Sequence, residues 1–214
     1  MEYFELIKEA LFQTIYMVFV STLFAVVIGL IPAVVLTYTS PNGLRPNSKV
    51  YNVLDLVINI LRSFPFIILM VAVVPVTRAI VGKSIGTTAA IVPLTIAAAP
   101  FAARVIESSL REVNPGVIEA AKSFGASNFQ ILTKVMLKEA FPSIILGITL
   151  TVISVVSYSA MAGAIGGGGL GDVAVKYGYY RFKTEVTVYT VIILIILVQG
   201  IQSLGNLIYK KLNK

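Results

Sequence analysis

Two short glycine-containing segments are the parts of this chain whose residue types and spacing could bind a nucleotide. Residues 82–84, Gly-Lys-Ser, match the end of a phosphate-binding loop, but Thr77 occupies the position of the loop's first glycine and no strand precedes it. The glycines within residues 166–171 have the spacing of a dinucleotide fingerprint, yet they follow a long apolar helix instead of a strand. We therefore expect no nucleotide site and no cofactor bound by this chain.

The four glycines of residues 166–169 have a simpler explanation. Glycine adopts positive φ without a steric penalty, so the cluster predicts that a helix ends or unwinds here. An anion site made by the backbone amides of the same segment is the alternative that the pattern leaves open.

Composition narrows the chemistry further. The chain contains no Cys, His or Trp, which excludes thiol nucleophiles, disulfides, imidazole bases and Cys/His zinc sites and leaves only carboxylate or hydroxyl catalysis open. The net charge of +7 is scattered between apolar segments, which favours loops near anionic lipid over a nucleic-acid interface. With 57% hydrophobic residues and a mean hydropathy of +0.90, the chain is too apolar for a soluble domain. We expect an integral membrane protein that binds no nucleic acid.

Five apolar stretches are long enough to cross a bilayer core about 30 Å thick, which requires about 20 helical residues. Backbone groups in lipid find no water to bond, so each stretch is predicted to be helical. The second stretch reaches full length only if it includes Arg62. The sequence thus predicts a single all-α membrane domain over residues 1–214, with spans at about 12–38, 53–76, 84–103, 140–164 and 186–209.

The Lys and Arg residues indicate how the helices are oriented. If the N-terminus lies outside, the inside segments, which end with Lys214, hold ten of them and the outside segments hold six, with Arg62 left out. Cytoplasmic loops are enriched in Lys and Arg. We therefore expect an outside N-terminus, a cytoplasmic C-terminus and a cytoplasmic loop over about residues 104–139.

This loop is predicted to contain short helices. Glu107 and Arg111 are spaced i, i+4, which favours continuation of the third span beyond the membrane. Asn114 and Pro115 suit the start of a new helix, and Gly125 suits its end. We expect one helix over about residues 115–124 and a second over about 128–138 that leads back to the membrane.

Small apolar residues recur along the first short helix at spacings of three and four, which gives it an apolar face beside two charged residues, Glu119 and Lys122. Such a face predicts a protein partner. The alternative is a solvated loop in which Glu119 and Lys122 form an i, i+3 ion pair. The face comprises Val117, Ala120, Ala121 and Phe124.

The same loop carries a recognisable signature, Glu119-Ala120-Ala121 followed after three residues by Gly125, with Val135 and Leu137 at its later apolar positions. In this respect the chain resembles the transmembrane subunits of bacterial ABC importers. One departure is that Lys138 stands where the signature has a proline. Within that family the chain most resembles methionine importer permeases, a similarity carried by residues 62–69, 84–94 and 158–161 and extending through nearly the whole chain.

The resemblance implies the five-helix type I ABC importer permease fold and a transport subunit without enzymatic activity, in a bacterial cytoplasmic membrane. It implies a homodimer, two ATP-binding subunits that carry ATP and Mg²⁺, and a substrate-binding lipoprotein. Methionine is the implied substrate, and the resemblance leaves open whether D-methionine and related derivatives are also carried. The first alternative is an ABC permease for another amino acid or a small polar solute. The second alternative is an ATP-independent secondary transporter. The residues implied to contact the ATPase are Glu119, Ala120, Ala121, Ser123, Phe124 and Gly125.

The fourth span carries a stripe of small and polar residues at alternating spacings of four and three. The stripe could line a pore or pack against another helix, because small residues allow close helix contact in membranes. We expect Met161 to close the pore and Tyr158 to line it with Ser154, since a flexible thioether fills an apolar constriction well. The full stripe is Gly147, Thr151, Ser154, Tyr158, Met161 and Ile165.

Arg62 is the one charged residue expected inside a span. We expect its side chain to reach towards the cytoplasmic head groups, near Asp55. Contact with a substrate carboxylate is the alternative, since intramembrane charges usually mark a pathway or a partner. Pro65, Pro75, Pro93 and Pro100 are expected to kink or end helices.

Overall fold

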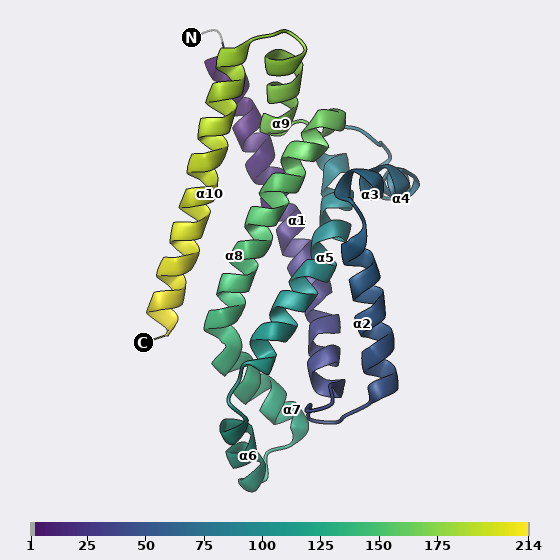
Figure 1. Ribbon diagram of the computed structural model, residues 1–214, viewed down its shortest axis with the longest axis vertical. Coiled ribbons are helices and arrows are strands. Elements are labelled where there is room, and N and C mark those ends of the chain that lie inside the picture. The colour runs from purple at the N-terminus through teal and green to yellow at the C-terminus, as the bar shows by residue number, and fades with distance from the viewer. Residues whose placement is uncertain (1–2, 214) are drawn as a thin grey trace.

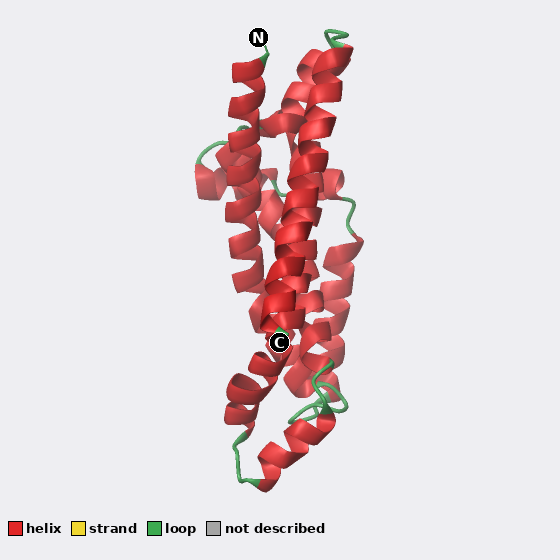
Figure 2. Ribbon diagram, turned by 90° about the vertical axis from the view of Figure 1, so that its left-hand side faces the viewer, coloured by secondary structure: helices red, strands yellow, loops and turns green. Residues whose placement is uncertain are grey.

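The computed structural model describes residues 3–213, and throughout this range the elements are helical (Figures 1 and 2). Met1, Glu2 and Lys214 lie outside the described residues. Long apolar helices are α1 (Phe4–Thr39), α5 (Thr87–Arg111), α10 (Thr184–Leu212) and the continuous helical run Asn128–Gly167. These four helices coincide with four of the five predicted spans, so the expected all-α membrane architecture is confirmed.

The second predicted span is not one helix. Helix α2 (Ser48–Ser63) and helix α3 (Phe66–Ala72) meet at a bend of 100°, and α4 (Val74–Val81) follows (Figure 1). Phe64 is extended, with ψ 126°, because the residue before a proline is disfavoured in the helical region. Pro65 therefore ends α2, and Pro75 occupies the first turn of α4, as predicted for both. Pro93 and Pro100 instead lie inside α5, which continues past them.

The core is centred on α5, the most buried of the long helices. Met17 of α1, Leu94 of α5 and Val155 of the fourth span are completely buried against one another. At Gly29 the backbones of α1 and α5 approach closely, since a Cβ there would lie 2.7 Å from the carbonyl oxygen of Ala99. Small residues thus bring two membrane helices into contact, as is typical of packing in lipid.

The helix that contains the fourth predicted span begins before that span. The expected separate helix over 128–138 is wrong as a separate element, because α7 (Asn128–Gln130), the π-helical η1 (Ile131–Met136) and α8 (Leu137–Ala162) form one uninterrupted helical run. Lys138 and Pro142 both lie within this run. A proline is tolerated there because it lacks one N–H group, so only one backbone carbonyl loses its helical hydrogen bond and needs another partner.

At its far end the fourth span unwinds through η2 (Gly163–Gly167), α9 (Gly169–Val173) and η3 (Ala174–Tyr179). Gly166, Gly168 and Gly169 all have positive φ, which confirms that the glycine cluster ends the helix. The amides of Gly169 and Leu170 donate hydrogen bonds of 2.8 and 2.9 Å to the side chains of Gln13 and Thr14 on α1. These amides are therefore occupied within the chain, which argues against the alternative of an anion site.

Candidate functional site: the α6 loop and the neighbouring charged network

Helix α6 (Pro115–Ser123) projects from the end of the bundle opposite the N-terminus (Figure 1). The Asn114 side chain accepts a hydrogen bond of 2.8 Å from the amide of Gly116, so Asn114 is the predicted N-cap. Pro115 occupies the first helical position, where no N–H is needed. Two residue types at the right positions are thus enough to begin this helix.

The end of α6 is defined equally well. Gly125 has φ 78°, its amide donates to the carbonyl of Lys122, and the amide of Ala126 donates to the carbonyl of Ala121. These two bonds constitute a Schellman motif. A Cβ at Gly125 would have open space around it, so the reason for glycine at this position is its backbone conformation and not crowding. The predicted helix and its stop at Gly125 are confirmed.

One face of α6 packs on the protein and the other does not. Ile118 and Ala121 lie against the apolar cluster at this end of the bundle, whereas Val117 and Phe124 are exposed. The exposed fraction of Phe124 is 91%, the highest of the large apolar side chains described. Ala121, also on the predicted apolar face, is half-buried because the helix turns it towards the bundle, and its contact with the ATPase stays a prediction. The outward face of α6, defined as Val117, Glu119, Ala120, Ser123 and Phe124, is free for a partner.

The solvated-loop alternative predicted an ion pair between Glu119 and Lys122. Among residues 3–213, the ion pairs include none between these two side chains. The Ser123 hydroxyl donates to the carbonyl of Glu119 at 3.0 Å and so is satisfied within the helix. The Glu119 carboxylate is thus exposed beside the apolar residues of the outward face, where it can orient a partner.

The segment after α6 is held by its own cap. Ser127 and Gln130 form a capping box, in which each side chain bonds the backbone amide of the other residue at 3.3 and 2.9 Å. The Asn128 side chain also donates to the carbonyl of Leu44 at 3.4 Å, which ties the segment to the turn after α1. The outward face of α6 is therefore presented on a well-ordered support.

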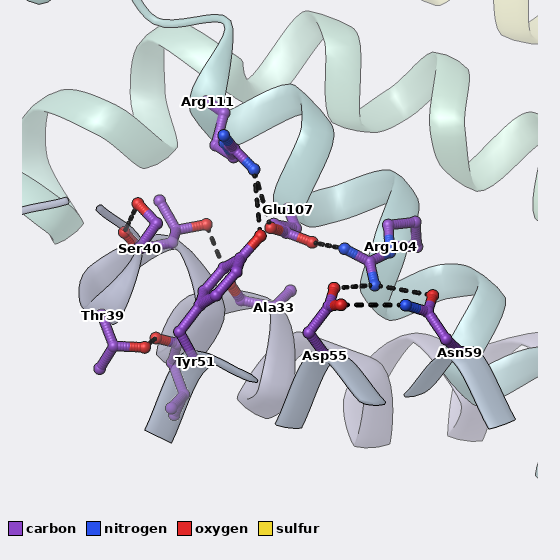
Figure 3. Close-up of polar contacts among 11 residues, drawn as sticks. Ala33, Thr39, Ser40, Tyr51, Asp55, Asn59, Arg104, Glu107 and Arg111 are labelled. Atoms are coloured by element: carbon purple, nitrogen blue, oxygen red, sulfur yellow. Dashed lines mark hydrogen bonds and ion pairs between the residues drawn. The ribbon is translucent and has the colours of Figure 1, made fainter. Parts of the chain in front are cut away.

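Beside this loop lies a network of charged side chains that joins α2 to α5 (Figure 3). Glu107, whose exposed fraction is 1%, pairs with Arg104 at 2.7 Å and with Arg111 at 3.4 Å. Arg104 also pairs with Asp55 of α2 at 2.6 Å, and its guanidinium donates to Asn59 at 3.1 Å. The i, i+4 pair of Glu107 and Arg111 was predicted, but the bridge from Arg104 to Asp55 was not. Its partner residues are 49 positions apart, so only the fold reveals it.

The predicted stripe on the fourth span divides into two parts. Gly147 and Thr151 are buried, and a Cβ at Gly147 would clash with Val105 of α5, so this half serves helix packing. Tyr158 is half-buried and Met161 is 45% exposed. The packing interpretation therefore holds for the half nearer α6, while the other half leaves side chains uncovered.

Arg62 lies in the last turn of α2. Its guanidinium sits 6.0 Å from the centre of the Phe101 ring, while Asp55 pairs with Arg104. The expected reach of Arg62 towards the cytoplasmic head groups stays a prediction.

Over residues 25–214 the chain matches the family described as binding-protein-dependent transport system inner membrane component. The chain belongs to this family. It is 50% identical over 209 residues to a probable D-methionine transport system permease protein, MetI, of Vibrio cholerae, covering 98% of this chain and 93% of the relative. It is 48% identical to MetI of Escherichia coli K12 over 158 residues, which cover 74% of this chain and 73% of the relative.

The fold of this inner membrane component is also similar to a solved structure. A crystal structure of the MetNI methionine ABC transporter in an inward-facing conformation superposes with a TM-score of 0.97 at 44% identity, covering 100% of this chain and 99% of that chain. The expected type I importer permease fold is therefore confirmed. Because its relatives are permease proteins of transport systems, the expectation of a transport subunit instead of an enzyme is confirmed too.

Proposed function

We propose that this chain is the pore-forming permease subunit of an ATP-driven ABC importer that takes up methionine. The observation that carries the proposal is the outward face of α6, an apolar and uncovered surface on a rigidly capped helix, in a chain about half identical to methionine transport permeases. Exposed apolar surface of this kind marks a protein-binding site. The chain would act as a homodimer in the bacterial cytoplasmic membrane, with its N-terminus outside, its C-terminus and α6 in the cytoplasm, and lipid around its apolar helices.

Two ATP-binding subunits would bind at α6 and supply ATP and Mg²⁺, while a substrate-binding lipoprotein would deliver methionine from outside. In the described part of the chain no cluster of Asp or Glu could hold a metal ion, and the Gly-Lys-Ser segment lies at the end of α4, far in sequence from α6. Energy for transport would enter through the contact between α6 and the ATP-binding subunits.

The structure suggests how that contact acts on the pore. Helix α6 follows α5 after only three residues, so a displacement of α6 is passed directly to the most buried long helix. The charged network holds α2 to α5, which would make these helices move together. Shifting a two-state pore from 1:99 to 99:1 takes about 5.5 kcal/mol of differential binding, which closure of the ATP-binding subunits has to supply through α6.

The uncovered half of the stripe on the fourth span would face the pore. Met161 would close it, while Tyr158 and Ser154 line it. Met161→Ala should raise ATP hydrolysis in the absence of substrate by about threefold, because a smaller side chain removes the apolar contact that holds the pore shut. ATPase and uptake assays on proteoliposomes measure this. Unchanged hydrolysis and unchanged uptake would contradict the gate.

The proposed function is tested by reconstituting the chain with its ATPase and binding protein and measuring uptake of radiolabelled L-methionine. We expect uptake that requires ATP and the binding protein, with D-methionine and methionine derivatives compared in the same assay. Uptake of a different amino acid or small solute, but not of methionine, would support the alternative substrate. Uptake by the chain alone without ATP would instead indicate a secondary transporter and would overturn the proposal.

A further inference from the structure

A cavity of about 180 Å³ is lined by residues of α2, α3, α5 and α8 and of the bend between α2 and α3. It is large enough for about six water molecules at about 30 Å³ each, which is the scale of one small solute and not of a larger ligand. Seven of the eight lining residues have apolar or aromatic side chains, and Arg62 supplies the only charge among the described residues. The lining residues are Leu61, Arg62, Phe64, Phe66, Leu69, Ala97, Phe101 and Tyr158.

The guanidinium of Arg62 has no anionic partner here. No carboxylate within residues 3–213 pairs with it, since Asp55 is engaged by Arg104 and Asn59. Its contact within the chain is the face of Phe101 at 6.0 Å, which is a weak cation–π distance. A charged group inside a membrane span without a counter-ion is costly and usually serves an ion or a substrate.

The position of Arg62 along α2 also argues against simple contact with the lipid head groups. From the start of the helix at Ser48, Arg62 lies about 21 Å along the axis at 1.5 Å per residue. With a bilayer core about 30 Å thick, this places its Cα well within the core if α2 begins at the cytoplasmic boundary. The bend of 100° after Arg62 then opens the cavity at this depth.

Two other aromatic lining residues stack on each other. Phe66, the first residue of α3, stacks on Tyr158 of α8 with ring centres 4.9 Å apart and planes inclined by 13°. Phe66 is buried, so the bend in the chain and this stack fix this part of the lining together. Aromatic rings attract both aliphatic chains and thioether sulfur. The cavity thus combines one fork-shaped cation with aromatic and aliphatic side chains, which matches the carboxylate and the unbranched apolar side chain of an amino acid.

We propose that this cavity is a substrate-binding site of the permease, in which Arg62 binds the α-carboxylate of methionine and the Phe66–Tyr158 stack contacts its side chain. The inference rests on the proposed function for the identity of the substrate. Arginine is well suited to the role because its planar fork binds a carboxylate through two parallel hydrogen bonds. Recognition within the membrane would add a second selection step after the binding protein.

The test is equilibrium binding of tritiated L-methionine to the purified permease–ATPase complex without the binding protein, with the ATPase subunit alone measured in parallel to subtract its own sites. Arg62→Gln should raise the Kd by at least about 10-fold through loss of the charge-assisted pair. Arg62→Lys should still raise it about fivefold, because a lysine keeps the charge but lacks the fork. Methioninamide, which lacks the carboxylate, should compete poorly with methionine for the wild-type site.

Lys49→Gln, which removes an exposed cation at the other end of α2, is the matched control and should leave the Kd unchanged. A head-group role for Arg62 predicts instead that Arg62→Lys binds as the wild type does, and that result would overturn the proposal. So would equal competition by methioninamide, or a wild-type complex that transports methionine but shows no binding beyond the ATPase subunit. Failure of the wild-type complex to transport methionine with ATP would be a failure of the proposed function itself.

Discussion

The α6 loop and the Asp55–Arg104–Glu107–Arg111 network lie at the same end of the molecule. They differ in whether their charged side chains have partners within the chain. In the network every charge is paired within the chain, and Glu107 is completely enclosed. On the outward face of α6 the Glu119 carboxylate stands exposed beside uncovered apolar side chains. The difference shows which polar residues hold the scaffold and which are available to another protein.

The comparison therefore predicts a separation of effects. Changes in the network should lower stability, whereas changes on the outward face of α6 should leave stability alone and reduce contact with the ATPase. The two classes of variant are distinguished by measuring thermal unfolding and ATPase binding on the same preparations.

The largest effect is expected for Glu107→Gln, which leaves Arg104 and Arg111 without their shared buried partner. Arg104 keeps its pair with Asp55 and Arg111 is half exposed, so no charge is left buried without a partner. Loss of the charge-assisted bonds of the buried Glu107 should lower the free energy of unfolding by about 2–3 kcal/mol. Thermal unfolding of the purified protein measures the change. Glu112→Gln, an exposed carboxylate one turn further on, is the control and should unfold as the wild type does. If both variants unfold with the same free energy, the network does not stabilise the protein.

Phe124→Ser is expected to have the next largest effect. Burial of a phenylalanine side chain contributes about 2 kcal/mol, so its loss should weaken binding of the ATPase subunit about 30-fold. The melting temperature should not change, because Phe124 is 91% exposed within the chain. Phe182→Ser, at a side chain that is 87% exposed near the opposite end, serves as the control. If both variants bind the ATPase normally, Phe124 is not part of the interface.

A smaller effect is expected for Gly125→Val, which imposes a β-branched side chain on a residue at φ 78°. The strain amounts to about 1–2 kcal/mol and should disturb the end of α6, so ATP-driven uptake should fall about 10-fold. Gly82→Val is the matched control, because Gly82 also ends a helix at φ 76° in open space but lies on α4. Comparable losses of uptake in the two variants would mean that backbone strain, and not the position of α6, is responsible.

The same contrast explains what the sequence could predict. Helix α6 is encoded locally, since Asn114, Pro115 and Gly125 each specify one of its ends, and the spans follow from hydropathy and length. Contacts between distant segments were missed. The sequence indicated only that Asp55 lies near Arg62, whereas the fold pairs Asp55 with Arg104, 49 residues away.

The broken second span was missed for a related reason. Pro65 signals the end of a helix, but a proline is also compatible with a kinked continuous span. The bend of 100° brings Phe66 onto Tyr158, a contact between α3 and α8 that no local pattern encodes. The residues before Lys138 were assigned to a separate loop helix, although the helical backbone continues through them into the fourth predicted span.

The central claim, that the outward face of α6 binds the ATPase, can be measured directly because the chain contains no cysteine. Ala120→Cys places a single thiol on this face, and Phe182→Cys places one near the opposite end. Maleimide labelling of Ala120→Cys should slow at least about 10-fold when the ATPase subunit is added, since the centre of an interface excludes water, while labelling of Phe182→Cys stays constant. An unchanged labelling rate at Ala120→Cys in the assembled complex would contradict the claim.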